Sequence, residues 1–215
     1  KQLRINDNPL LGSLALNSIS QLGNSSSSYE LELTNNNNLS SISMNSLSHL
    51  NGDLRITDNS ALLSLSLPLL QRIEQNIWVE RNPLLAGLSL PNLTELYGRI
   101  DITSNDILDT VSIPLLESTD GRLFINQNLF LADLDFSSLQ MTGGPLWIYG
   151  GIDMIANFSS LTQVLGDVNI RDIHFDSIDV SQLHTIDGNI TIQDNSGWTF
   201  LDLSALDTGV INIDI

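Results

Sequence analysis

Residues 52–73 read GDLRITDNSALLSLSLPLLQRI, and this pattern returns along nearly the whole chain. Taking the first apolar residue of each Leu-x-Ile pair as a marker gives ten positions: Leu3, Leu31, Leu54, Ile77, Ile100, Leu123, Leu146, Val168, Ile190 and Ile211. Successive markers are 28, then 23 (five times), 22, 22 and 21 residues apart. A repeat of this length predicts a stacked solenoid, because one unit cannot bury its apolar edge without neighbours above and below.

Within each repeat the Leu-x-Ile pair has the two-residue period of a β-strand. An asparagine follows three residues later in most repeats: Asn8, Asn36, Asn59, Asn82, Asn105, Asn128 and Asn195, with Gly151 and Ile173 as the departures. We expect these asparagines to turn inward and bond the backbone of adjacent turns as a ladder.

A second and a third apolar pair, such as Leu65/Leu67 and Leu70/Ile73, complete each repeat. Prolines end the second strand in three repeats, since proline has no amide proton to donate: Pro68, Pro91 and Pro114. Glycines two residues before each new strand are expected to turn the last corner: Gly52, Gly98, Gly121, Gly144, Gly166, Gly188 and Gly209.

Together these features predict an all-β, three-sided, right-handed β-solenoid of ten rungs with an asparagine ladder and little or no helix. Stacking at the strand spacing makes a rod on the order of 45 Å tall. One continuous core indicates a single domain over residues 1–215. The chain starts and stops inside predicted strands, so we expect it to be a fragment of a longer protein with caps or signals outside it.

Segments such as residues 52–73 and GRIDITSNDILDTVSIPLL (98–116) resemble the receptor L-domain repeat, a leucine-rich β-solenoid. That repeat occurs in the insulin and EGF receptors and in fungal GPI-anchored cell-wall proteins. The resemblance implies an extracellular or cell-surface recognition module, and in the insulin receptor the ligand docks on the sheet formed by strand one. This chain has no cysteine, unlike the animal receptor domains, which favours a microbial surface or secreted protein.

The charge is strongly acidic and uneven. Acidic residues outnumber basic ones by 25 to 8, for a net charge of −17, and residues 101–215 hold 17 acidic and 2 basic residues. Nucleic acid is excluded as a partner and an anionic membrane surface is disfavoured, because both carry the same sign of charge. No run of 18 apolar residues is present, so we expect no membrane span in this sequence.

We expect functional residues at the outward positions of strand one, because the inward side chains form the core. Alternation places an aromatic cluster there with charged neighbours: Trp78, Phe124, Trp147, Tyr149, Arg55, Glu80, Asp101 and Arg122. Exposed aromatic residues beside arginine are typical of binding sites for protein or polysaccharide. The same rings could instead only stack on one another along the rungs. We therefore predict a non-catalytic recognition or adhesion module that uses this exposed aromatic face.

Two alternatives concern other surfaces. The chain could be a structural subunit of a cell wall, surface layer or filament that self-associates through its open ends or its serine face. The outward column of strand two carries small hydroxyls: Ser43, Ser66, Ser89 and Ser112. This flat face also suggests ice binding, although threonine arrays are more typical of that activity.

Signals for catalysis are weak. The sequence contains no nucleophile elbow, zinc-protease motif or phosphate loop, so we predict neither an enzyme nor a cofactor. The one acidic cluster with histidine contains Asp172, His174 and Asp176. In an extended segment these side chains would share one side, which makes them weak candidates for a divalent metal.

Overall fold

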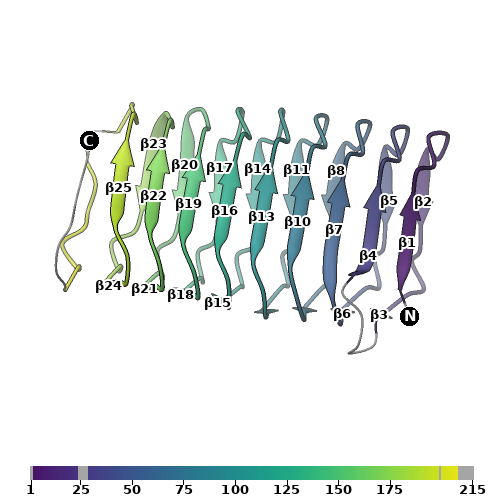
Figure 1. Cartoon of the computed structure of the whole chain (residues 1–215), viewed down its shortest axis with the longest axis horizontal. Helices are drawn as coiled ribbons and strands as arrows, with labels where there is room; N and C mark the ends of the chain where they lie inside the picture. Colours follow the sequence, from purple (N-terminus) through teal and green to yellow (C-terminus); the bar gives the residue numbers. More distant parts are fainter. Residues whose placement is uncertain (1, 24–28, 199, 208–215) are drawn as a thin grey trace.

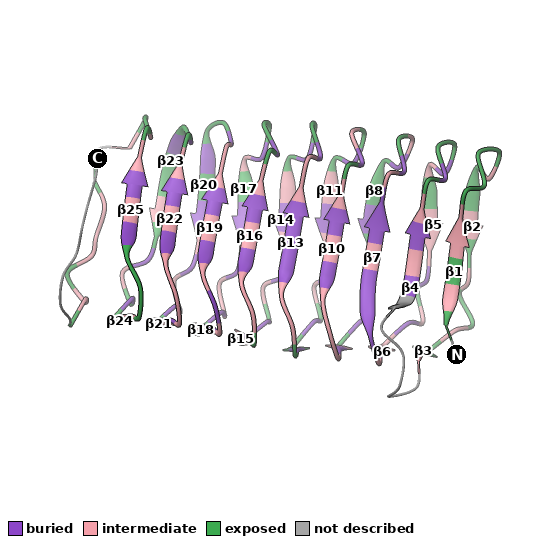
Figure 2. Ribbon diagram, in the orientation of Figure 1, coloured by how far each residue is buried: buried purple, intermediate pink, exposed green. Residues whose placement is uncertain are grey.

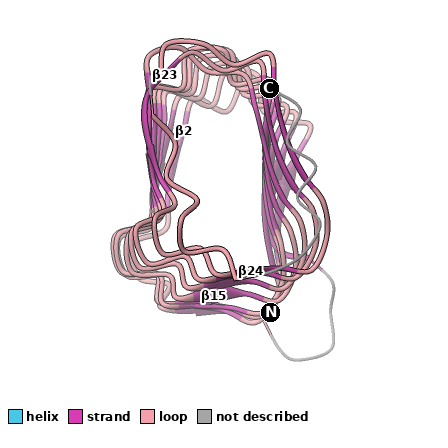
Figure 3. Ribbon diagram, turned by 90° about the vertical axis from the view of Figure 1, so that its left-hand side faces the viewer, coloured by secondary structure: helices cyan, strands magenta, loops and turns pink. Residues whose placement is uncertain are grey.

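The computed structural model describes residues 2–23, 29–198 and 200–207 of the 215-residue chain. These residues form a parallel β-solenoid without any helix, in which coils of about 23 residues stack along one axis (Figure 1). Viewed along that axis, strands occupy three sides and loops close the edge between the first and second sides (Figure 3). The predicted fold class is therefore confirmed.

The first side is a nine-stranded parallel sheet. Its strands are β1 (Leu3–Asn6), β4 (Tyr29–Thr34), β7 (Asp53–Thr57), β10 (Ile77–Glu80), β13 (Ile100–Thr103), β16 (Leu123–Asn126), β19 (Leu146–Tyr149), β22 (Val168–Arg171) and β25 (Ile190–Gln193). Nine of the ten markers therefore lie opposite one another, from Leu3 to Ile190. The tenth marker, Ile211, and the glycine before it, Gly209, lie outside the described residues.

The second side is divided into two sheets. Six strands form the larger one: β8 (Ser64–Ser66), β11 (Gly87–Ser89), β14 (Thr110–Ser112), β17 (Asp133–Asp135), β20 (Met154–Asn157) and β23 (Phe175–Asp179). The first two coils form a separate pair, β2 (Ser13–Ala15) and β5 (Ser41–Ser43). The regular stack amounts to roughly seven coils, so the prediction of ten rungs was too high.

The third side has eight very short strands. They are β3 (Gln21–Leu22), β6 (His49–Leu50), β9 (Arg72–Ile73), β12 (Glu95–Leu96), β15 (Ser118–Thr119), β18 (Met141–Thr142), β21 (Gln163–Val164) and β24 (Thr185–Ile186). Inward side chains from all three sides form one apolar column, and the buried stretches recur at the same level of successive coils (Figure 2). Leu54, Leu65 and Ile73, one from each side of the same coil, are each at most 1% exposed.

The predicted asparagine ladder closes the corner between the first and second sides. Asn82 is fully buried, and its Nδ2 donates to the Ile56 carbonyl at 3.0 Å and to Asn105 Oδ1 at 3.2 Å. Its Oδ1 accepts the backbone amide of Asn59 at 3.1 Å. Equivalent bonds link Asn36 through Asn128, so buried backbone groups at this corner are paired by side chains.

Residues just before the ladder adopt left-handed backbone conformations, which the sequence did not reveal. Eight residues precede the ladder position directly with φ values between 52° and 60°: Asp7, Asn35, Asp58, Arg81, Ser104, Gln127, Asp172 and Asp194. Aspartate and asparagine tolerate this region better than other non-glycine residues. Each coil therefore turns through a left-handed residue and then points the next side chain inward.

The glycines that precede the first-side strand of each coil were expected to turn the last corner, but the structure gives them a different role. Gly98 and Gly121 do not have positive φ values. A Cβ on Gly98 would lie 2.4 Å from the Gln75 carbonyl oxygen of the preceding coil. The glycine is therefore required because the coils approach closely at this corner, not because the backbone is left-handed.

Candidate functional site

The outward side chains of the first sheet, with Arg99 and Arg122 directly before β13 and β16, are called the first face. Strand register places Trp78 opposite Asp101, Asp101 opposite Phe124, and Phe124 opposite Trp147. Tyr149 lies in the next outward row, opposite Asn126. The structure thus brings the predicted aromatic residues onto one surface, although the Asp101 coil separates Trp78 from the other three.

The four rings are half-buried rather than exposed, which corrects the expectation of an exposed aromatic cluster. Phe124 meets Trp147 edge to face at 5.8 Å between ring centroids, with 85° between the ring planes. It meets Tyr149 in the same manner at 5.9 Å. Neighbouring strands are close enough for large side chains to cover one another.

Arginine side chains cover the ring faces. Arg55 and Arg99 lie over Trp78, with 5.5 and 5.3 Å from guanidinium carbon to ring centroid. Arg122 lies over Phe124 at 4.9 Å and over Trp147 at 5.8 Å. A guanidinium over an aromatic face is attracted by the ring quadrupole. The outer surface therefore consists largely of ring edges and guanidinium groups.

Asp101 lies on the buried side of the first face and bonds the side chains around it. Its residue is 2% exposed, and its carboxylate accepts the Trp78 indole N–H at 3.0 Å and Arg122 Nε at 2.7 Å. Arg99 Nε lies 2.9 Å from the same carboxylate. Because it is buried, Asp101 fixes the positions of its neighbours and offers no surface of its own to a ligand.

Glu80 occupies the second outward row, opposite Thr57 and Thr103, and is half-buried. It accepts a 3.3 Å hydrogen bond from Arg81 Nη1. Of the predicted charged residues, Arg55 and Arg122 touch the rings directly, whereas Glu80 belongs to the edge of the first face, where the chain turns into the corner loop.

Three buried polar atoms near Trp147 have no hydrogen-bond partner within the described part of the chain: Trp147 Nε1, Asn169 Oδ1 and Arg171 Nε. Asn169 pairs with Trp147 and Arg171 pairs with Tyr149 across β19 and β22. Burial raises the pKa of the Tyr149 hydroxyl, and the nearby Arg171 charge partly opposes that rise. Arg171, the last arginine of the sequence, was not among the predicted site residues.

The weak metal candidates are not brought together. Asp172 occupies the left-handed corner with φ of 56°, so the extended segment begins only after it. His174 instead pairs with Asp153, with 2.8 Å between Nδ1 and Oδ1. Across residues 2–23, 29–198 and 200–207, no three histidine or carboxylate side chains are placed to hold a metal ion.

The serine column of the second side is interrupted. Ser66, Ser89 and Ser112 stand in register in the six-stranded sheet. Ser43 belongs to the separate two-stranded sheet, where its hydroxyl donates to Asn17 Oδ1 at 2.7 Å. The hydroxyls therefore form an ordered row of three, which continues into Asp135.

Comparison with known proteins finds no matching family model, no similar curated protein and no similar solved structure. The solenoid architecture therefore stands on the structure itself. No helix in the described ranges has the length and apolar character of a membrane span.

Proposed function

We propose that this chain is a non-catalytic recognition module of the extracellular or cell-surface kind, related in character to receptor L domains. It binds a protein or polysaccharide through the first face. The observation that carries this proposal is the cluster of Trp78, Phe124 and Trp147 under arginine side chains anchored by buried Asp101. Aromatic residues and arginine dominate the binding energy of known interfaces.

Pre-organisation supports this interpretation. Side chains that are already fixed lose little conformational freedom when a ligand binds, which lowers the entropic cost of association. Arg122 contacts two rings and donates two hydrogen bonds to Asp101, at 2.7 and 3.1 Å. The binding surface therefore needs little rearrangement.

Charge distribution points to a ligand rich in oxygen acceptors. Five of the seven arginines lie in, or directly before, first-sheet strands of a chain whose net charge is −17: Arg4, Arg55, Arg99, Arg122 and Arg171. The unpaired nitrogens of Trp147 and Arg171 add donors at one end of the cluster. Hydroxyl, carbonyl or carboxylate oxygens of a partner would satisfy these donors after small side-chain movements.

Alanine replacement of Trp78 and Trp147 tests the proposal. Binding to an array of glycans and purified cell-surface proteins should be lost in W78A and W147A, while circular dichroism stays unchanged. Tyr97→Ala is the matched control, because Tyr97 is an aromatic residue on the third side with Arg72 stacked over it at 4.9 Å. Equal binding by all three variants and the parent chain would overturn the proposal.

A further inference from the structure

A polar groove crosses the corner between the first and second sides, apart from the first face. It is shallow and open to solvent, with a volume of about 430 Å³. It is lined chiefly by Asn35, Asn37, Asp58, Arg81, Ser104 and Asp106. These residues come from four successive coils, so the groove runs along the stack for roughly 15 Å at the usual strand spacing.

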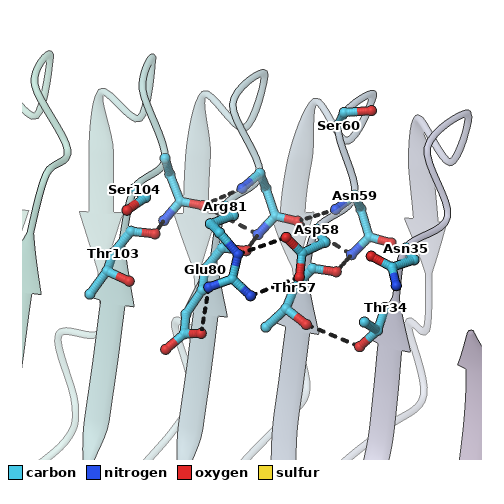
Figure 4. Close-up of polar contacts among 12 residues, drawn as sticks. Thr34, Asn35, Thr57, Asp58, Asn59, Ser60, Glu80, Arg81, Thr103 and Ser104 are labelled. Atoms are coloured by element: carbon cyan, nitrogen blue, oxygen red, sulfur yellow. Dashed lines mark hydrogen bonds and ion pairs between the residues drawn. The ribbon is translucent and has the colours of Figure 1, made fainter.

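The backbone presents these side chains in a fixed manner. Asn35, Asp58, Arg81 and Ser104 have φ values of 57°, 58°, 52° and 57°, and each is followed by a buried ladder asparagine. Arginine and serine are unfavourable in this conformation, and such strain persists only where the surrounding structure enforces it. The tight corner of each coil supplies that enforcement, since Asp172 has the same conformation before Ile173. The corner side chains point away from the core (Figure 4).

Contacts within the groove order it further. Arg81 Nε and Nη2 donate to the two oxygens of Asp58, each at 2.7 Å (Figure 4). The Ser60 hydroxyl donates to Asn37 Oδ1 at 3.2 Å, and the Ser104 hydroxyl bonds Gln127 Oε1 at 2.9 Å. A forked guanidinium–carboxylate pair has a defined geometry and holds both partners in place.

Charge and polarity decide which ligands fit. Two carboxylates, Asp58 and Asp106, and one guanidinium, Arg81, line the groove in a chain of net charge −17. An anionic ligand is disfavoured because the groove is itself slightly negative. The lining contains both donors and acceptors, which suits neutral groups that both donate and accept, as hydroxyls do. Asp106 is exposed, and no hydrogen bond or ion pair engages its carboxylate among the described residues.

We propose that this groove binds a short stretch of neutral, hydroxyl-rich polysaccharide lying across the coils. The carboxylate of Asp106 accepts hydrogen bonds from neighbouring hydroxyls. The N–H groups that Arg81 and Asn35 do not use toward Asp58, Glu80 and Asp7 donate to ring and hydroxyl oxygens. This site goes beyond the proposed function, because it shares no residue with the first face and predicts a ligand class of its own.

Amide chemical shifts of the ¹⁵N-labelled chain, titrated with neutral tetrasaccharides of β-1,3-glucose, β-1,4-glucose and mannose, test the proposal. At least one tetrasaccharide should shift the amides of residues 81 and 104–106. Asp106→Ala should weaken its binding about tenfold, the loss expected for a hydrogen bond to a charged group. Asp109→Ala is the matched control, because Asp109 is an exposed aspartate of the same coil outside the groove.

The inference is wrong if none of the tetrasaccharides shifts these amides at millimolar concentration, or if D106A and D109A weaken binding equally. It is also wrong if Trp147→Ala abolishes the tetrasaccharide binding while Asp106→Ala does not. That last result would assign the sugar to the first face and leave the proposed function standing.

Discussion

The central coils, from β7 to β16, and the later coils, from β19 to β25, fill the corner between the first and second sides with different residues. Central coils repeat every 23 residues and close their corner with buried asparagines. The two coils that start at β19 and β22 have 22 residues and carry Gly151 and Ile173 at the ladder position. The solenoid thus accepts both a polar and an apolar corner, provided that the buried backbone groups are paired.

Apolar filling replaces the ladder in the later coils. A Cβ on Gly151 would lie 2.3 Å from Met154 Cε, so the methionine occupies the space beside the glycine. Ile173 is 1% exposed, and its amide still donates to Asn195 Oδ1 at 3.1 Å. Phe158 of the first later coil stacks on Phe136 of the last central coil, with 5.7 Å between ring centroids. Packing has therefore taken over part of the role that side-chain hydrogen bonds have in the central coils.

The central and later coils also differ in their charged residues. Arginines in the central coils are paired with carboxylates, as Arg81 is with Asp58 and Arg122 with Asp101. The later coils contain a single arginine, Arg171, among many aspartates. The first face spans both regions, because Trp78, Asp101 and Phe124 lie in the central coils, whereas Trp147 and Tyr149 lie on β19.

The largest expected effect comes from breaking the ladder where it is continuous. Asn82→Ala removes the partner of the Asn59 amide and of the Ile56 carbonyl, both buried. Leaving such groups unpaired costs about 1–3 kcal/mol each, so the free energy of unfolding should fall by on the order of 4 kcal/mol. Urea unfolding followed by circular dichroism measures this loss.

Asn195→Ala is the comparison variant, because Asn195 is only half-buried and follows the two positions without asparagine. Its cost should be less than half that of Asn82→Ala. Equal losses in the two variants would show that the continuous ladder has no special role in the central coils.

An intermediate effect is expected at the anchor of the first face. Asp101→Asn keeps an oxygen for the Trp78 indole but removes the charge that pairs with Arg99 and Arg122. Breaking a fully buried pair costs about 3–5 kcal/mol. Because both arginines are partly exposed, we expect about 2 kcal/mol, together with altered tryptophan fluorescence.

Asp153→Asn provides the control in the later coils. Its partner His174 and Asp153 itself are well exposed, so the change should cost at most about 0.5 kcal/mol. If the two variants lose equal stability, the Asp101 network does not stabilise the central coils beyond an ordinary surface pair.

The smallest effect concerns pH and two aspartates of the same coil. Hydrogen bonds from Arg81 lower the pKa of Asp58, whereas burial raises the pKa of Asp53. Stability from Asp58 is present above its unfolded-state pKa and is lost as pH falls through the lower folded-state value. The Asp53 contribution has the opposite sign, because its charged form is less favourable in the folded chain and stability falls as pH rises through its range.

Asp58→Asn should therefore lower stability at pH 7 by about 0.5 kcal/mol, as for a surface pair, and this difference should vanish in acid. Asp53→Asn should be neutral or slightly stabilising at pH 7, because an amide oxygen can still accept the Asn76 bonds at 2.9 and 2.8 Å. Thermal melts of both variants between pH 3 and pH 7 measure the two trends. A loss for Asp53→Asn that grows towards pH 7 would contradict this assignment.

Much of the fold could be predicted because the signal is local and repeated. Inward residues such as Leu54 and Ile77 are apolar in every coil, and Asn59 and Asn82 mark the corner at the same spacing. The left-handed residue before the ladder was missed, since positions as different as Asp58 and Arg81 share it. There the inward turn of the next residue, an asparagine in the central coils and Ile173 after Asp172, sets the backbone conformation, and the residue type does not.

For the binding surfaces, the sequence predicted which residues point outward but not what those side chains contact. Alternation placed Trp78 and Trp147 on the outward side, but it could not show that arginines from neighbouring coils would cover their rings. Alternation also predicted that Asp101 lies on the surface, although neighbouring side chains bury Asp101. The proposed polar groove was missed for the same reason, because its lining comes from four coils.

The sequence by itself determined the coil length, the three strands of each coil and the inward residues, because a two-residue period and a 23-residue repeat depend on backbone geometry alone. Only the tertiary structure decided which outward side chains are exposed, paired or strained. Coiling makes residues 22 or 23 positions apart into neighbours on adjacent strands, and their sizes and charges then determine what the surface presents.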